Sequence, residues 1–198
     1  MFTDISIDGK KEKCFLICKG EKKTLKNIIT KDLTLPDLVD FTSYLKTDVS
    51  EKLFIKITPS KYGKDNLVNF LLRNILSERV FLNAKTIKEY RYTQKLAAIG
   101  INTPKVYAGG FLLSNVYKYS GIIIYEKLDN LVTAQEILLE ETCQKKKSLL
   151  LHNIYIDYKK MAKNNLHFRD FHMSNVLVDP EDMKIYWIDP ALSRVVNF

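Results

Sequence analysis

The sequence has no apolar run close to the roughly eighteen residues that a membrane-spanning helix requires, and its first residues lack the basic-then-apolar order of a secretory signal. We therefore expect the protein to stay in the cytosol. Cysteine is scarce as well: Cys14, Cys18 and Cys143 form an odd set without the spacing of a metal site. We expect buried free thiols at these positions rather than a metal or redox centre.

Negative charge is in the minority, because 31 Lys and Arg residues face 23 Asp and Glu residues, for a net charge of +8. This excess favours an anionic partner such as a nucleotide, a nucleic acid or a phosphate-bearing surface. Basic and aromatic residues do not interleave in an RNA-binding pattern, which argues against nucleic acid. Hydrophobic residues at 46% and charged residues at 27% are typical of an ordinary folded protein with one domain or two small lobes.

The first third of the chain has the short apolar runs of β-strands, at residues 13–20 and 52–58. Residues 33–45 between them are compatible with strand or irregular structure. From Asp65 the period changes, and residues 65–82 predict a helix with a basic polar edge. The residues expected on one stripe of this helix are Leu67, Phe70, Leu71, Asn74, Ile75 and Arg79.

A second helix is predicted over residues 83–100, with Asn83 as its N-cap and Gly100 just past its end. Its otherwise largely apolar face carries one carboxylate, that of Glu89. Residues 105–113 and 121–128 then predict two strands joined by a turn.

The remainder of the chain predicts two more helices. Residues 133–136 have the form of a capping box that opens a short helix. A longer helix follows and ends at Asn164, with apolar residues three or four apart. Those residues are Leu150, Ile154, Tyr158 and Met161.

Polar residues near the end of the chain have a spacing that invites a chemical interpretation. Two apolar runs, 175–179 and 184–189, are separated by a Pro-Glu-Asp turn and predict a β-hairpin. Such a hairpin would bring Asn175 and Asp189 to one edge, beside Asp170. Two oxygen ligands there suit Mg²⁺, and a third carboxylate can accept a proton from an attacking hydroxyl.

Phosphoryl transfer also needs a lysine for the nucleotide phosphates, held by a helix carboxylate, and Lys56 and Glu89 fit these two roles. With these elements in order, the chain resembles the protein-kinase-like superfamily. The segment 170–175 reads Asp-x-His-x-x-Asn, the version found in kinases of small molecules and glycolipids. Residues 56–76, followed by residues 89–107, resemble bacterial lipopolysaccharide core kinases, especially the heptose kinases, which share an extra basic helix here.

The resemblance implies an α+β, bilobal protein-kinase-like fold. Residues 1–128 would form an N-lobe with an antiparallel sheet, and residues 129–198 a short, mainly helical C-lobe. The main chain of Glu126, Lys127 and Leu128 would receive the adenine of ATP.

The resemblance also implies a role for each polar residue of the C-lobe. Asp170 would orient or deprotonate the acceptor hydroxyl, and Asn175 and Asp189 would hold Mg²⁺. Lys56, fixed by Glu89, would pair with the nucleotide phosphates. For the imidazole at position 172, we leave open a brace for the loop, an approach to the phosphate, and a hydrogen bond to backbone.

Three features depart from the kinase pattern. The nearest glycine before Lys56 is Gly20, so no glycine-rich loop precedes the lysine. Asp189 is followed by Pro-Ala instead of Phe-Gly, which makes a phosphorylation-switched activation loop unexpected. The chain ends at Phe198, nine residues after Asp189, so either a compact lobe suffices or the lobe is truncated.

The leading hypothesis is an ATP-dependent kinase that phosphorylates a sugar hydroxyl, a heptose of lipopolysaccharide core. It would act on an anionic glycolipid at the inner face of the inner membrane, with peripheral contact through the basic helix near Arg73 and Arg79. The first alternative is a soluble small-molecule kinase of the aminoglycoside or choline type. The second is a pseudokinase or truncated remnant that binds a nucleotide or partner without catalysis.

Overall fold

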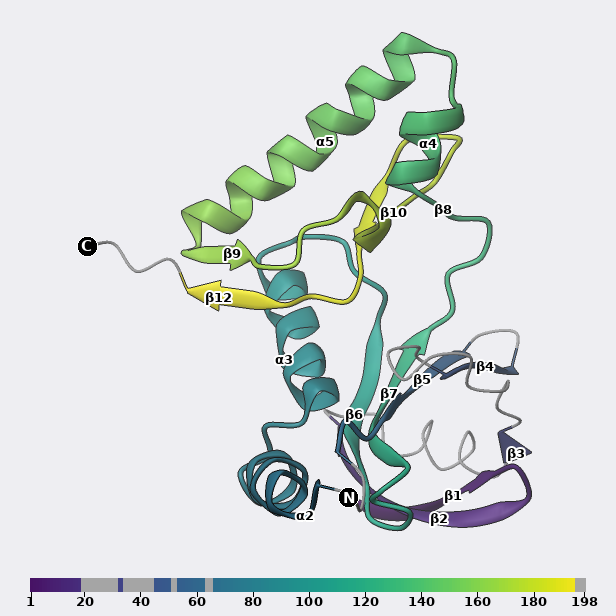
Figure 1. Ribbon diagram of the computed structural model, residues 1–198. Helices are drawn as coiled ribbons and strands as arrows, with labels where there is room; N and C mark the ends of the chain where they lie inside the picture. Colours follow the sequence, from purple (N-terminus) through teal and green to yellow (C-terminus); the bar gives the residue numbers. More distant parts are fainter. Residues whose placement is uncertain (19–31, 34–44, 51–52, 63–65, 195–198) are drawn as a thin grey trace. The chain divides into compact units, whose positions relative to one another are not determined.

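A computed structural model describes residues 1–18, 32–33, 45–50, 53–62 and 66–194 (Figure 1). Its contacts divide the chain into a first unit, Met1–Tyr90 with Lys105–Lys127, and a second unit, Arg91–Pro104 with Leu128–Phe198. The change of unit after Lys127 lies one residue from the boundary expected at 128. Residues 91–104, expected in the N-lobe, have their contacts in the second unit instead.

In the described part of the first unit, seven strands form a sheet in the order β3-β1-β2-β6-β7-β5-β4. Every neighbouring pair is antiparallel except β1 with β3. The strands are β1 (Phe2–Ile7), β2 (Lys10–Cys18), β3 (Asp32–Leu33), β4 (Leu45–Ser50), β5 (Leu53–Pro59), β6 (Val106–Leu112) and β7 (Tyr119–Glu126). The strands expected near 13–20, 52–58, 105–113 and 121–128 are confirmed, and most of the ambiguous segment 33–45 lies outside the described residues.

A tight hairpin joins β1 to β2. Asp8 and Gly9 form its two-residue turn with φ angles of 51° and 72°, and Ile7 pairs with Lys10 across it. Positive φ at both positions is the requirement of a type I′ turn, which Asp-Gly meets at low cost. The hairpin places apolar side chains of both strands in the core of the sheet, including Ile5, Ile7, Cys14 and Leu16.

The prediction of three buried thiols holds for Cys14 alone. Burial raises the pKa of the Cys14 thiol to about 12, so this group stays protonated and inert. Cys18 is half-buried, and Cys143 is exposed because it immediately precedes a helix at the surface.

The helix expected over residues 65–82 forms, but its winding differs from the prediction. A single turn, α2 (Leu67–Asn69), continues into an eleven-residue π-helix, η2 (Phe70–Val80). Phe70, Asn74 and Arg79 are the buried residues of η2, whereas Leu67 and Leu71 are about half exposed, at 53% and 51%. The three buried residues all belong to the predicted stripe, whereas Leu67 and Leu71 of the same stripe are exposed. The wider turn of a π-helix thus changes which members of the stripe face inward.

The second predicted helix is α3 (Lys85–Ala98), whose first helical residue follows Ala84. Asn83 therefore lies one residue too early to be the N-cap. The predicted end is confirmed: Gly100 has φ +71°, its N–H donates to the Ala97 carbonyl, and the Ile101 N–H donates to the Leu96 carbonyl. This pair of bonds is a Schellman motif, in which the left-handed residue is most easily a glycine.

The second unit contains two helices and several short strands. A complete capping box between Thr133 and Glu136 opens its first helix, as predicted, and its second helix buries Leu150, Ile154 and Met161 and has Asn164 as its C-cap. The elements are β8 (Val132–Thr133), α4 (Ala134–Glu140), α5 (Gln144–Lys163), β9 (Leu166–Phe168), η3 (Met173–Asn175), β10 (Val176–Val178), β11 (Ile185–Trp187) and β12 (Leu192–Arg194).

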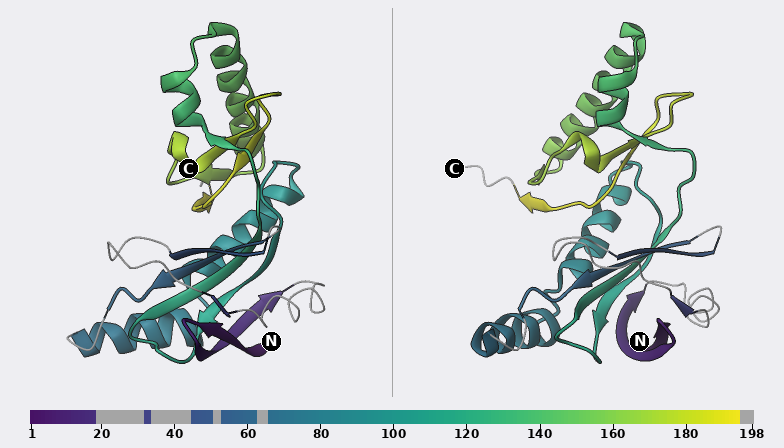
Figure 2. Two further views of the ribbon diagram at one scale, coloured as in Figure 1. Left: turned by 90° about the vertical axis from the view of Figure 1, so that its right-hand side faces the viewer. Right: turned by 45° about the vertical axis from the view of Figure 1, so that its right-hand side comes forward.

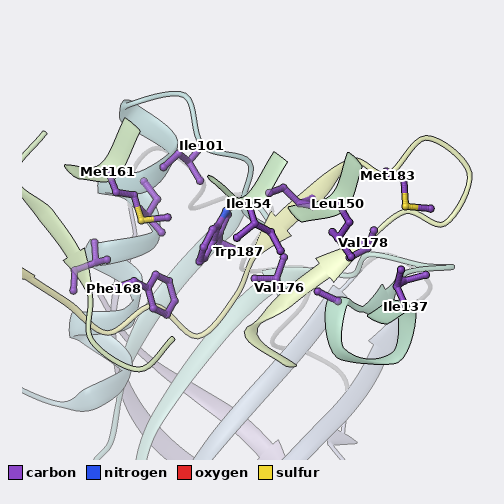
Figure 3. Close-up of a cluster of buried hydrophobic side chains, with 14 residues drawn as sticks. Ile101, Ile137, Leu150, Ile154, Met161, Phe168, Val176, Val178, Met183 and Trp187 are labelled. Atoms are coloured by element: carbon purple, nitrogen blue, oxygen red, sulfur yellow. The ribbon is translucent and has the colours of Figure 1, made fainter. Parts of the chain in front are cut away.

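One hydrophobic cluster organises the second unit (Figure 3). Trp187 and Phe168 are fully buried in it, with ring centroids 5.2 Å apart. The cluster draws on α5, on the short strands and on the carboxyl-terminal end of α3, which explains why residues 91–104 belong with this unit.

Candidate active site

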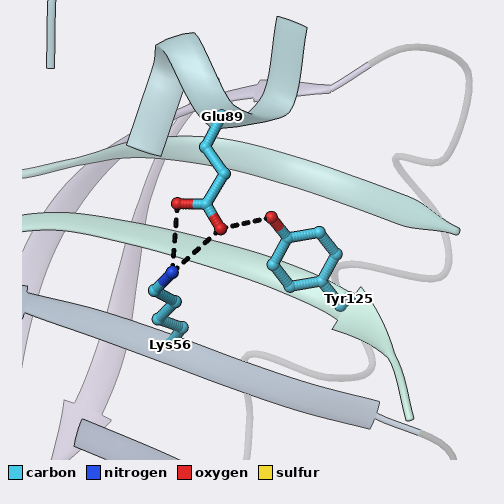
Figure 4. Close-up of polar contacts among 3 residues, drawn as sticks. All are labelled: Lys56, Glu89 and Tyr125. Atoms are coloured by element: carbon cyan, nitrogen blue, oxygen red, sulfur yellow. Dashed lines mark hydrogen bonds and ion pairs between the residues drawn. The ribbon is translucent and has the colours of Figure 1, made fainter. Parts of the chain in front are cut away.

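An ion pair lies inside the first unit between β5 and α3. The Lys56 ammonium is 3.0 Å and 3.2 Å from the two carboxylate oxygens of Glu89 (Figure 4). Lys56 retains 6% of its accessible surface and Glu89 2%, so both charges are removed from water. Removing the partner of a buried charge is costly, so each group holds the other in place.

The sheet and the helix explain why these two side chains meet. Lys56 pairs with Ile123 in the antiparallel register of β5 and β7. The amino-terminal half of α3 lies along one face of this sheet (Figure 2). Tyr90 and Thr86 of α3 approach the sheet so closely that a Cβ at Gly109 would lie 2.6 Å from the Tyr90 Cβ. Glu89, on the buried side of α3, is thereby brought onto Lys56.

A third member of this group, Tyr125, was missed by sequence reasoning. Its hydroxyl donates a 2.5 Å hydrogen bond to Oε1 of Glu89 (Figure 4). Tyr125 is 7% exposed and follows Ile123 by two positions on β7, so it faces the same side of the sheet. Only the register of β5 against β7 identifies Tyr125 as a partner of Glu89, and this register could not be read from the sequence.

The predicted adenine-binding segment follows Tyr125 directly. Glu126 is exposed and pairs with Leu53, and its main-chain N–H donates to the Lys105 carbonyl at 2.8 Å. This N–H therefore cannot donate to a nucleotide base. Lys127 and Leu128 are half-buried, and the change from the first unit to the second falls between them.

The predicted hairpin of the second unit is confirmed. Val176 of β10 pairs with Trp187 of β11 in antiparallel register, and the Ile188 N–H donates to the Asn175 carbonyl at 3.0 Å. Asn175 and Asp189 therefore leave the two strands at the same end, as their spacing predicts.

The loop from Asp170 to Asn175 is fixed through its main chain at both ends. At one end the Arg169 N–H donates to the Ala191 carbonyl at 2.8 Å, and β9 pairs with β12 beyond it. At the other end the Asn175 carbonyl accepts from the Ile188 N–H at 3.0 Å, and the Asn175 side-chain amide nitrogen donates to the Asp170 carbonyl at 3.0 Å. Asp170, Asn175 and Asp189 are thus brought together within the second unit, because the segment around Asp189 bonds to both ends of this loop.

The side chains of the loop are turned toward solvent. The Nε2 atom of His172 lies 3.1 Å from Oδ1 of Asp170, and the two side chains are 67% and 68% exposed. The observed partner of the imidazole is thus the Asp170 carboxylate.

Two features of the segment 187–189 indicate a constrained site. Asp189 has φ +51°, a left-handed conformation that residues other than glycine adopt mainly at turns and functional positions. The indole N–H of Trp187 donates to Oδ2 of Asp157 at 2.9 Å. Burial raises the pKa of Asp157, and the bond from Trp187 and the charge of Lys160 offset this only in part.

The donor set fits a Mg²⁺ ion that is completed by phosphate and water. Among the described residues no cluster of three or more His, Cys, Asp and Glu side chains could hold a metal alone. Because the Asn175 amide nitrogen is bonded to Asp170, its oxygen is the atom left for a cation. Asn175 and Asp189 together would supply the few protein oxygens that Mg²⁺ usually takes.

Arg79 does not have the surface position expected of it. It is buried at 9% exposure, and its guanidinium donates at 3.2 Å to the carbonyls of Leu112 and Tyr119. Burial lowers its pKa, an effect opposed by the neighbouring Glu78. Arg79 therefore anchors η2 to the sheet instead of contributing to a basic surface.

Solved structures of two proteins resemble this chain in fold. WaaP in complex with acyl carrier protein is 17% identical, with a TM-score of 0.54 over 89% of this chain and 70% of that one. The bifunctional kinase-methyltransferase WbdD is 18% identical, with a TM-score of 0.50 over 79% of this chain and 31% of its own length. The fold is therefore the predicted α+β protein-kinase-like fold.

The family follows from the sequence. The model of the lipopolysaccharide kinase (Kdo/WaaP) family matches residues 45–194, and the chain belongs to this family. The match confirms the resemblance to lipopolysaccharide core kinases and the expected enzyme class, a phosphotransferase acting on an alcohol group. A comparison with curated protein sequences found no match.

Proposed function

We propose that this chain transfers the γ-phosphate of ATP to a sugar hydroxyl of lipopolysaccharide core, specifically on a heptose. The carrying observation is the buried Lys56–Glu89 ion pair, at 3.0 Å, in a chain that belongs to a kinase family. A desolvated lysine held by one carboxylate is a fixed positive charge, and phosphoryl transfer depends on positioning and charge neutralisation.

In the first unit, Lys56 would pair with the phosphates of ATP while Glu89 fixes the ammonium. Tyr125 orients Glu89 through its 2.5 Å hydrogen bond. The adenine would be received by the Glu126 carbonyl and the main chain of Lys127 and Leu128, since the Glu126 N–H is bonded to Lys105.

In the second unit, Asp170 would accept the proton of the sugar hydroxyl, as its exposed carboxylate can reach a solvent-borne acceptor. His172, at 3.1 Å, would hold that carboxylate in position. Asn175 and Asp189 would be the protein ligands of Mg²⁺, which when bound neutralises charge on the phosphates.

We propose that the acceptor is an anionic glycolipid and that the protein works in the cytoplasm, in peripheral contact with the inner face of the inner membrane. The net charge of +8 supports a negatively charged partner. None of the helices formed by the described residues combines the length and apolar character needed to span a bilayer. Acyl carrier protein, solved with WaaP, is a protein partner to be tested for this chain.

Transfer to a defined acceptor tests this function. Purified protein with Mg-ATP should phosphorylate dephosphorylated core oligosaccharide, detected by mass spectrometry. Asp170→Asn should lower the transfer rate by about 10² to 10⁴, because a positioned general base contributes that much. Glu181→Gln, another exposed carboxylate of the second unit, should transfer at the wild-type rate.

The same preparation separates the alternatives. Transfer by the wild type to aminoglycosides or choline, but to no core acceptor, would identify the soluble small-molecule kinase. A remnant without catalysis would transfer to neither class, yet at a hundred times its dissociation constant Mg-ATP would still add about 2.7 kcal/mol of stability. Absence of both transfer and stabilisation would refute the proposed function altogether.

A further inference from the structure

The helix formed by α2 and η2 is inverted: its inner face is polar and its outer face apolar. On the inside, the Asn74 amide nitrogen donates to Ser60 Oγ and, at 3.2 Å, to the Tyr62 carbonyl. The buried guanidinium of Arg79 bonds to carbonyls at both ends of the β6–β7 turn. The helix is thus attached to the sheet by hydrogen bonds, with Phe70 stacked on Tyr117 at 4.4 Å as the apolar contact.

The outer face carries large aliphatic side chains and one phenylalanine, each 43% to 68% exposed. These outer residues are Leu67, Val68, Leu71, Leu72, Leu76, Val80 and Phe81. A π-helix has roughly four to five residues per turn, so positions 71–72, 76 and 80–81 line up along one side. The seven residues form one apolar stripe, which a surface helix facing water would not retain.

Cations border the stripe. The Lys61 ammonium and the Arg73 guanidinium lie 5.7 Å and 5.6 Å from the centroid of the same Tyr62 ring. Lys88, exposed on α3, is close enough to Glu78 to influence its charge. Burial raises the pKa of Glu78, and the bond from Ser120 and the charges of Arg79 and Lys88 oppose this. Long basic side chains beside an apolar stripe can reach a layer of anionic headgroups while the stripe enters the acyl region.

We propose that the α2–η2 helix inserts its apolar stripe into the surface of an anionic phospholipid bilayer, where it docks the kinase beside its lipid-borne acceptor. The stripe contains no Tyr, Trp or polar group that could select a protein surface, and Leu and Val are under-represented among residues that dominate protein interfaces. The docking inference rests on the proposed function for its glycolipid acceptor, but its physical basis is independent of catalysis.

Vesicle sedimentation with the full chain tests the inference. The wild type should bind vesicles of phosphatidylethanolamine and phosphatidylglycerol, and more weakly those of phosphatidylcholine. Leu72→Gln with Leu76→Gln should lower the partition constant by about tenfold or more, because two side chains leave the buried apolar area. The matched control is Leu139→Gln with Leu151→Gln, two leucines of the second unit that are 75% and 46% exposed.

Two further variants distinguish insertion of the helix into the bilayer from charge attraction to its surface. Arg73→Gln should weaken binding severalfold on the anionic vesicles only, and less so at high salt. Leu76→Trp should shift its emission to shorter wavelength on binding and be quenched by bromine-labelled acyl chains. The native Trp187 is fully buried and gives a constant background.

Several results would overturn the inference. These are no vesicle binding by the wild type, equal binding by the leucine variants and the control, or no acyl-chain quenching of Leu76→Trp. Loss of self-association or of acyl carrier protein binding in the leucine variants, without vesicle binding, would assign the stripe to a protein partner. Transfer to water-soluble core oligosaccharide should be unchanged in these variants, so a failed docking inference and a failed kinase assignment give different results.

Discussion

The two groups of site residues are held in opposite ways. In the first unit, Lys56, Glu89 and Tyr125 are buried and fixed by one another's side chains. In the second unit, Asp170 and His172 are about two-thirds exposed, on a loop whose ends are fixed by main-chain hydrogen bonds. The first group thus contributes to the stability of the fold, whereas the side chains of the second group contribute little to it. Substitutions in the first group should therefore lower the free energy of unfolding much more than substitutions in the second.

The largest expected effect is on the buried ion pair. Glu89→Ala should lower the free energy of unfolding by about 3 to 5 kcal/mol, because it removes the carboxylate that faces the buried Lys56 ammonium. Urea denaturation measures this loss. The double variant Lys56→Met with Glu89→Leu should recover most of it, since neither charge remains.

The matched comparison in the second unit is Asp170→Asn, which should change the free energy of unfolding by less than roughly 0.5 kcal/mol, as expected for an exposed side chain. If the double variant is as unstable as Glu89→Ala, or if Asp170→Asn destabilises equally, the contrast between the two groups fails.

Tyr125→Phe sharpens the comparison within the first unit. It removes one bond to a charged group and should cost about 1.5 kcal/mol of stability. Because Glu89 is then less firmly oriented on Lys56, the KM for ATP should rise severalfold with a smaller change in kcat. Steady-state kinetics and thermal melting measure the two effects.

Tyr155→Phe provides the control for Tyr125→Phe, as its ring is 60% exposed on α5. A Tyr125→Phe protein that melts and binds ATP like Tyr155→Phe would show that the 2.5 Å bond has no positioning role.

The smallest expected effect concerns Asp157, which accepts the hydrogen bond of the Trp187 indole. Burial raises the pKa of this carboxylate in the folded state. Its contribution to stability is therefore greatest below the ordinary pKa and declines as pH rises toward the raised value. Asp157→Asn should match the wild type near about pH 3.5 and gain relative stability of roughly half a kcal/mol or less at neutral pH.

Thermal melts of both proteins across this pH range measure the effect. A stability difference that does not vary with pH would mean that Asp157 is as well solvated when folded as when unfolded.

Much of the second unit could be predicted because its signals are local. The capping box at Thr133, the period of α5 and the hairpin between Asn175 and Asp189 each depend on neighbouring residues. The pairing of the two hairpin strands places Asn175 and Asp189 at the same end, so a local sequence pattern was enough to predict that they lie close together.

The first unit was less predictable because its site depends on contacts between distant strands. Lys56 and Glu89 could be proposed from residue type, but Tyr125 required the register of β5 with β7. The inverted helix was misassigned for a different reason. Spacings of three and four residues are ordinarily interpreted as an α-helical core face, so Leu67 and Leu71 were expected inside, whereas the π-helix leaves both exposed.

Gly109 and Gly121 allow α3 to lie unusually close to the sheet, because neither residue has a Cβ. A Cβ at Gly121 would lie 2.7 Å from Cγ2 of Thr86, and one at Gly109 2.8 Å from the Thr86 carbonyl. Thr86 fills the recess left by these two missing side chains and also donates to the Gly110 carbonyl. One methyl group at either position would lift the helix and carry Glu89 away from Lys56. The absence of a Cβ at these two glycines therefore sets the distance between Lys56 and Glu89, although the glycines contact α3 one helical turn away from Glu89.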